Sequence, residues 1–223
     1  MSVLLVSLLR SELTQRLAVE DWRLDPVALE PRYSHGVGDV FWQFGLNASG
    51  DGPVSFQPSV GVRHPETSQL YVKFRGLPPE PEVSFGVCSV GRGLADLLGR
   101  DGQRVAPSLR WRLSEESDVA RVADLMVSDL LGDGLPFLRT LSSAVDVFLH
   151  LENDQFRYQA LDGHLAIVAA LLGRQGPALS ALRSYAGEAS RQHDPARSHT
   201  WNFVSSYVAH FGIGDELIPD ARS

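Results

Sequence analysis

The sequence contains a single cysteine, Cys88, and a single lysine, Lys73, and no apolar run approaches the length of a membrane span. One cysteine excludes a disulfide within the chain and a metal site built from several thiolates. A membrane-spanning helix needs roughly 18 continuous apolar residues, which the chain does not have. The helical zinc motif and the P-loop are also missing. We therefore expect no metal, no cofactor and no membrane partner, and a cytoplasmic location.

The composition is that of a folded globular protein. The chain has 223 residues, of which 43% are hydrophobic and 21% charged, and this length allows one large domain or two small ones. Its formal net charge is -7. An acidic chain is poorly suited to nucleic acid, whose binding depends mainly on the neutralisation of phosphates. We expect a soluble protein that does not bind nucleic acid.

The negative charge is unevenly placed along the sequence. Residues 1–113 hold 12 acidic and 12 basic residues, whereas residues 114–223 hold 15 acidic and 8 basic ones. The hydrophobic periodicity changes at the same point, from mostly strand-like to helical. The sequence therefore predicts two subdomains: an α+β sheet subdomain over 1–113 and an acidic helical subdomain over 114–223.

The first half predicts a helix and a largely antiparallel sheet of four to five strands. A leucine every four residues indicates a helix with a buried stripe, formed by Leu5, Leu9, Leu13 and Leu17. Two segments of alternating apolar residues, from Val40 and from Val54, are separated by turn-forming residues and predict a hairpin. Pro58 within the second indicates an edge strand or a bulge. A short strand over 22–29, a helix over 65–77, strands over 83–90 and 108–113, and a helical turn over 94–98 complete this half.

The second half predicts helices throughout. Ser114 can cap a helix with Glu115 and Glu116 in its first turn. The apolar stripe of this helix consists of Val119, Val122, Ala123, Met126 and Leu130. We expect it to end at Gly132, and Pro136 to open a helix that continues to Phe148. An apolar helix over 164–172, a helix after Pro177 and an amphipathic helix carrying Trp201, Val204, Val208 and Phe211 follow.

The acidic residues of the first predicted helix form a candidate binding surface. Asp118, Asp124, Asp129 and Asp133 are expected on its polar side, away from the apolar stripe. Clustered charge of one sign raises association rates and selects partners of the opposite sign. The alternative is an ordinary solvated helix face. The first interpretation predicts a basic protein partner.

Other motifs point to chemistry less clearly. Arg110 and Arg112 flank Trp111 and, on a strand, would face the same side, where they could hold an anion or pair with nearby acids. The glycine-rich segment 86–93 follows a predicted strand, as a phosphate-binding loop would, but it also fits a plain turn into a helix. Cys88 is interpreted as a small strand residue. His193, Asp194 and His199 are interpreted as solvated loop residues.

Three segments together resemble a group of bacterial domains of unknown function, some of which lie beside toxin genes and are presumed immunity proteins. They are the hairpin from Val40 to His64, the strand 111–113 leading into an acidic helix, and the segment 134–138. The resemblance extends over the larger part of the chain and brings no catalytic residue with it. It implies a protein-binding role in a bacterial cytoplasm.

We therefore expect a non-enzymatic protein-binding protein, such as an immunity or inhibitor protein that docks a basic partner through the acidic helix. A second hypothesis is an enzyme or small-ligand-binding protein with a site between sheet and helices, near Arg110, Arg112 and His64. A third is an oligomerisation module that uses the last helix, Trp201 to Phe211.

Overall fold

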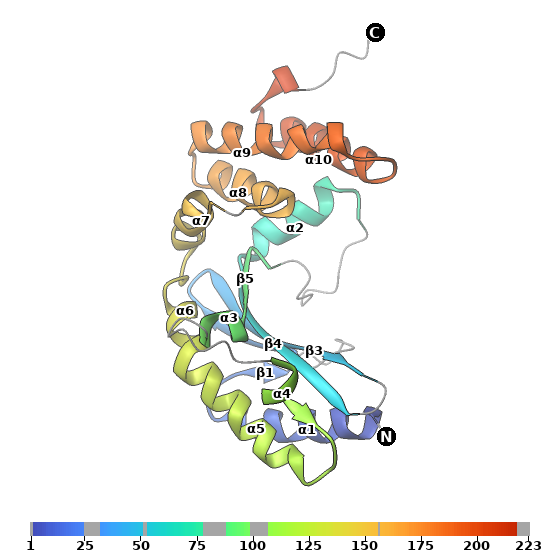
Figure 1. Cartoon of the computed structure of the whole chain (residues 1–223). Coiled ribbons are helices and arrows are strands. Elements are labelled where there is room, and N and C mark those ends of the chain that lie inside the picture. Colours follow the sequence, from blue (N-terminus) through green and yellow to red (C-terminus); the bar gives the residue numbers. More distant parts are fainter. Residues whose placement is uncertain are drawn as a thin grey trace. The chain divides into compact units, whose positions relative to one another are not determined.

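A computed structural model of the chain describes residues 2–24, 32–50, 53–77, 88–98, 107–155 and 157–217. The fold is α+β, as the sequence predicts: an N-terminal helix, an antiparallel sheet and a helical C-terminal half (Figure 1). The chain forms two compact units. Unit 1 contains residues 1–62, 83–86 and 91–142, and unit 2 contains residues 63–82, 87–90 and 143–223. The predicted boundary between residues 113 and 114 therefore falls inside unit 1.

Unit 1 is built on the sheet. Its strands are β1 (Arg23–Leu24), β2 (Arg32–Val37), β3 (Val40–Ser49), β4 (Val54–Arg63), β5 (Val90–Gly93) and β6 (Arg112–Leu113). They pair in the order β1-β2-β3-β4-β5, and β6 also pairs with β4. The predicted hairpin is confirmed as β3 and β4. Val40, Trp42, Phe44 and Leu46 of β3 are buried, and Gln43 and Gly45 between them are buried too. Strand β2 was not predicted, because Ser34, His35 and Gly36 interrupt its apolar pattern.

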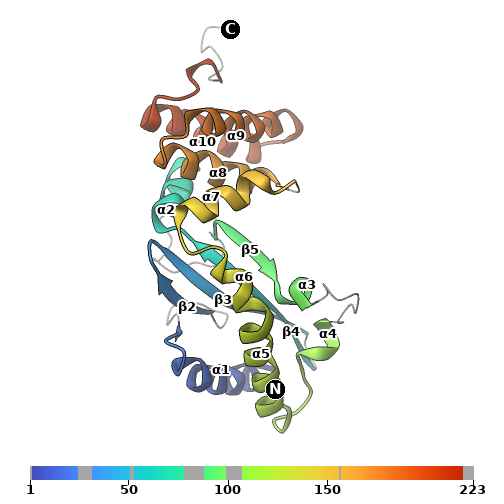
Figure 2. The same ribbon diagram turned by 90° about the vertical axis from the view of Figure 1, so that its left-hand side faces the viewer.

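Helices α1 (Ser2–Ala18) and α5 (Asp118–Asp129) lie side by side in unit 1 (Figure 2). The four leucines of the predicted α1 stripe are buried, and so are the five apolar residues of the α5 stripe. Helix α5 begins at Asp118 rather than at Ser114. The reason is that the Asp118 carboxylate accepts the backbone N–H groups of Ser114 and Glu115, which holds the preceding turn outside the helix.

The predicted helix end at Gly132 is wrong. The chain continues from α5 into a single π-helical turn, η3 (Leu130–Gly134), and then into α6 (Leu135–Arg139). Gly134 is packed tightly here: a Cβ at this position would lie 3.1 Å from side-chain atoms of Leu130 and Val60. Gly134 therefore serves a close contact inside the helix and does not terminate it.

Three further predictions need correction. Residues 107–110 form the short helix α4 (Pro107–Arg110), and only Arg112 and Leu113 are in a strand. Residues 90–93 of the glycine-rich segment form strand β5, which leads into helix α3 (Leu94–Leu98). Cys88 and Ser89 come before this strand, so the interpretation of Cys88 as a strand residue is wrong, and Gly86 and Val87 lie outside the described residues. The helix opened by Pro136 ends at Arg139, and a separate helix α7 (Ala144–Asn153) begins after Ser143, whose hydroxyl accepts the Asp146 N–H at 3.2 Å.

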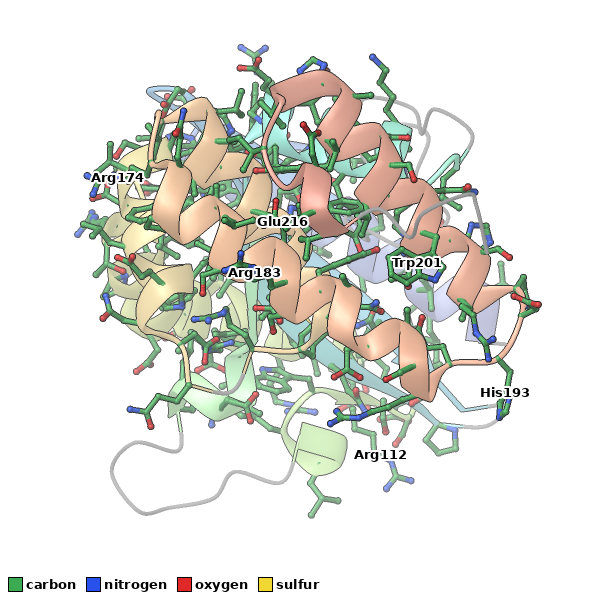
Figure 3. All side chains as sticks on the ribbon, turned by 90° about the horizontal axis from the view of Figure 1, so that it is seen from above. Arg112, Arg174, Arg183, His193, Trp201 and Glu216 are labelled. Carbon is green, nitrogen blue, oxygen red and sulfur yellow. The ribbon has the colours of Figure 1, made fainter. Side chains whose placement is uncertain are left out.

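Unit 2 packs helices around aromatic side chains. It contains α2 (Pro65–Phe74), α7, α8 (Gln159–Leu171), α9 (Gln175–Gly187), η4 (Glu188–Arg191), α10 (Ala196–Phe211) and η5 (Asp215–Leu217). Residues 161–169 of α8 are all buried, which confirms the prediction of an apolar helix between others. Arg183 of α9 and Glu216 of η5 form an ion pair at 2.8 Å on the surface of this unit (Figure 3).

Candidate functional site

The acidic segment, residues 115–133, is the most strongly charged part of the described chain. It holds six carboxylates (Glu115, Glu116, Asp118, Asp124, Asp129 and Asp133) and one basic residue, Arg121, for a formal net charge of -5. Its helix α5 packs its apolar stripe inward, so that most of the remaining positions lie at or near the surface of unit 1. The six carboxylates nevertheless have very different surroundings.

Asp118 organises the start of α5. Its carboxylate pairs with Arg121 at 2.7 Å and also accepts the two backbone N–H groups described above. The hydrogen bond from Arg121 is the main cause that lowers the pKa of Asp118, followed by that from the Ser114 N–H. Asp118 thus stays ionised well into acidic solution, but most of its acceptor capacity is already used by its own helix.

Asp124 is the most exposed of the paired acids. Its side chain is 68% exposed and accepts a hydrogen bond from the Arg16 guanidinium of α1 at 2.9 Å. Arg16 also contacts Glu12 one turn earlier in α1. The hydrogen bonds that Arg16 donates to Asp124 and Glu12 raise the pKa of its guanidinium, although an arginine is ionised at any physiological pH in either case. An exposed pair of this kind is weak and can exchange partners.

Asp129 belongs to the core and not to the exposed face on which it was predicted. Its side chain is 4% exposed and accepts hydrogen bonds from both Nε and Nη2 of Arg110, the former at 2.7 Å, and from Trp111 Nε1 at 2.9 Å. Trp111 is fully buried, so its indole N–H requires an acceptor inside the protein. The sequence does contain a signal for the burial of Asp129. This residue follows Met126 by three residues and precedes Leu130, so it borders the buried stripe.

The other acids of the segment face solvent. Asp133 is exposed on η3, and Glu115 and Glu116 are exposed before α5, where Glu115 accepts the Ser117 hydroxyl. Asp133 is close enough to Arg110 to help raise the pKa of that guanidinium, after the larger effect of Asp129. The carboxylates of the segment that stay exposed are therefore Glu115, Glu116, Asp124 and Asp133, whereas Asp118 is half-buried.

The two arginines of the second hypothesis do not lie on one strand face. Arg110 lies on α4 and is held by Asp129, whereas Arg112 is exposed on β6, where it pairs across the strands with Ser55. The expected common strand face is absent because 107–110 is helical. His64 belongs to unit 2, where its Nδ1 accepts the Thr67 N–H and caps α2.

The apolar face of α10, which the third hypothesis assigned to oligomerisation, is used within unit 2. Phe203, Val204, Tyr207 and Val208 are buried, and the Phe203 ring packs 4.2 Å from that of Tyr185, centroid to centroid. Trp201 is half-buried at the side of α10 (Figure 3). Little of this face therefore remains for a second copy.

Unit 2 contains a buried histidine whose position no local sequence pattern indicates. His164 of α8 is buried, and its ring stacks on Tyr71 of α2 with centroids 4.3 Å apart. Its Nδ1 has no hydrogen-bond partner among the described residues. Desolvation lowers its pKa to about 3, so the imidazole is neutral in the folded protein. A Cβ at Gly163 would meet the rings of both Tyr71 and Tyr185, and burial raises the pKa of the Tyr185 phenol.

The described residues contain neither a metal-binding cluster nor a membrane-spanning helix. No group of three or more histidine, cysteine, aspartate or glutamate residues in the described part of the chain is placed to hold a metal ion. Within those same residues, no helix is both long and apolar enough to cross a bilayer.

The charge asymmetry of the sequence does not follow the two units. Unit 1 holds 15 acidic and 11 basic residues, a formal net charge of -4, and unit 2 holds 12 acidic and 9 basic residues, a net charge of -3. The acidic segment is therefore a local feature of unit 1. Comparisons with models of protein families, with curated proteins and with solved structures found no match to this chain.

Proposed function

We propose that this chain is a non-enzymatic protein-binding protein, of the immunity or inhibitor type, that docks a basic partner through the acidic segment in a bacterial cytoplasm. The observation that supports this most is the surface left by Glu115, Glu116, Asp124 and Asp133 after Asp118 and Asp129 are occupied. Four exposed carboxylates within 19 residues attract cations over a distance of about 10 Å at 0.1 M salt. A basic partner would gain speed and selectivity of association from this field.

The pair between Arg16 and Asp124 makes this surface suitable for exchange. Asp124 is well exposed and its partner comes from another helix, so an incoming arginine or lysine can replace Arg16 at small cost. Arg16 keeps Glu12 as an alternative partner in that event. In the free protein Arg16 thus partly neutralises the charge of the docking surface, and a basic partner can still displace it.

The test is charge reversal with a matched control. One variant carries Glu116→Arg, Asp124→Arg and Asp133→Arg, and the control carries Glu152→Arg, Asp194→Arg and Asp215→Arg, which are exposed residues of unit 2. Both variants change the formal net charge equally. Each immobilised protein is exposed to lysate of the source cell at low and high salt, the retained proteins are identified, and their affinities are then measured with purified components.

We expect the first variant to lose the basic partner, with an affinity at least about tenfold weaker, which corresponds to 1.4 kcal/mol. The control should bind as the unmodified chain does, and added salt should weaken both complexes. If the two variants bound the partner equally and circular dichroism showed that both are folded, the acidic segment would not be the docking surface. A partner whose binding does not respond to salt would count equally against the proposal.

A further inference from the structure

The outer face of α1 has an unusual composition for a surface helix, because it carries no charge. The exposed residues of this helix are Val3, Leu4, Ser7, Ser11, Gln15 and Ala18, followed directly by Val19. Val3 and Val19 are each 82% exposed and Leu4 is 58% exposed. The charged residues Arg10, Glu12 and Arg16 are half-buried at the flanks. A solvated helix face normally carries charged side chains, and an uncharged face with exposed apolar residues indicates an interaction surface.

The order of these residues is symmetric about Ser11. Ser7 and Gln15 each lie four residues from it, Leu4 and Ala18 each lie seven residues from it, and Val3 and Val19 each lie eight. In an antiparallel pair of α1 helices related by a two-fold axis at Ser11, every exposed residue is therefore level with another exposed residue of the second copy. Apolar residues then meet at both ends and small polar residues meet in the middle. A surface that matches itself in this way is what an isologous dimer requires.

The charges next to α1 also favour antiparallel pairing of two α1 helices. The first turn of α1 contains no acidic residue, and Glu20 and Asp21, both exposed, follow the end of the helix. In the antiparallel pair the end of the helix that carries them lies beside the first turn of the second copy, at the positive end of its helix dipole. In a parallel pair Glu20 and Asp21 of both copies, four carboxylates in all, would gather at one end and repel each other.

We propose that the outer face of α1 is a homodimer interface, in which two copies of this chain pair antiparallel about Ser11. Serine and alanine side chains allow the helix axes to approach to about 8–10 Å. A single helix pair is a small interface, so the dimer should be weak and should depend on concentration. The proposal does not depend on the acidic segment, which leaves the two surfaces free to act independently.

The first test is the oligomeric state of the full chain. Sedimentation equilibrium should show a monomer and dimer that interconvert with concentration. Leu4→Asp combined with Ala18→Asp should weaken the dimer by about tenfold or more, because each dimer then holds four buried charges. Val145→Asp on α7, an apolar residue that is 42% exposed in unit 2, is the control and should leave the dimer unchanged. A full chain that stays monomeric at every concentration overturns the proposal.

The second test is the direction of pairing, using cysteine pairs under mild oxidation. Ser11→Cys should form an intermolecular disulfide, because the two copies meet at this residue. Gln15→Cys should not, because its two copies are separated by roughly 12 Å along the axis at a rise of 1.5 Å per residue. The unmodified chain measures any cross-linking through Cys88. Equal cross-linking of both variants indicates a parallel pair, and no cross-linking of Ser11→Cys excludes contact at this residue; either result overturns the proposed arrangement.

Discussion

Asp124 and Asp129 stand five residues apart on the same helix, and each holds an arginine from another helix. They differ in burial: the Asp124 side chain is 68% exposed and that of Asp129 is 4% exposed. In water an ion pair gains little over the separate hydrated charges, whereas a buried carboxylate with three donors cannot be removed without leaving those donors unsatisfied. Two residues that look alike in the sequence therefore contribute unequally to stability.

Asp129→Ala should reduce the free energy of unfolding by about 2–3 kcal/mol, because the Trp111 N–H and the inner part of Arg110 lose their acceptor. Asp124→Ala should change it by less than about 0.5 kcal/mol. Urea denaturation of both variants, followed by tryptophan fluorescence, measures the difference. Similar values for the two would mean that Arg110 and Trp111 find another acceptor.

His164 gives stability a dependence on pH. Its pKa in the folded protein is about 3, against an ordinary value of 6.5, so below pH 6.5 the unfolded chain binds a proton that the folded chain excludes. Stability from this group is therefore complete above pH 6.5 and falls as the pH decreases towards 3, by about 1.4 kcal/mol per unit.

The free energy of unfolding should accordingly fall by about 2 kcal/mol between pH 6.5 and pH 5 through this residue. His164→Phe keeps a ring against Tyr71 and should remove this part of the dependence. Denaturation of both proteins across this range isolates the effect of His164 from that of the other titrating groups. If the free energy of unfolding of the unmodified protein and of His164→Phe fell equally with decreasing pH, the folded protein would be able to bind the proton at His164.

At the level of elements, the start of α7 and the start of α5 offer a direct comparison. Ser143 caps α7 through a hydrogen bond from the Asp146 N–H, whereas Ser117, at the same position before α5, caps nothing with its side chain. An N-cap hydroxyl is worth about 1 kcal/mol. Ser143→Ala should therefore destabilise the protein by about that amount, and Ser117→Ala should cost less than half of it. Chemical denaturation distinguishes them; equal costs would show that α7 starts without help from Ser143.

The elements that could be predicted from the sequence are those whose buried apolar residues recur at a regular spacing. The leucines of α1, the alternation of β3 and β4 and the apolar run of α8 are of this kind. The sequence pattern failed where one contact overrides local preference. Arg110 and Trp111 alternate as strand residues do, yet both must reach Asp129, and a helical turn at 107–110 accompanies this contact.

For the candidate site, sequence alone located the acidic segment but not the state of each carboxylate. Composition gives the number of charges, whereas ion pairing depends on residues far away in the chain: Arg16 lies 108 residues before Asp124. The pairing partners of Asp124 and Asp129 were therefore beyond any local pattern. The loss of Asp129 from the surface is the main change to the predicted set.

For the whole molecule, the division into units predicts how the chain can be shortened. Residues 1–113 end before α5, which packs beside α1, so this fragment would expose much of the leucine stripe of α1. Residues 1–142 contain all of unit 1. We expect the fragment 1–142 to unfold cooperatively and to show a near-ultraviolet circular dichroism signal from buried Trp111. The fragment 1–113 should show neither the cooperative transition nor this signal. If 1–113 folded equally well, the boundary suggested by the charge would be the correct one.

The π-helical turn η3 has a consequence for the length of the chain. The buried positions run 119, 122, 126 and 130 before the turn and 134, 137 and 141 after it. These positions are separated by three or four residues. If Gly132 were removed, the later positions would become 133, 136 and 140, and the separations would still be three or four residues, as an uninterrupted α-helix requires. A Cβ at Gly132 would contact nothing, so its removal sacrifices no packing. This turn is therefore a place where one residue can be gained or lost in evolution while every side chain of the core keeps its neighbours.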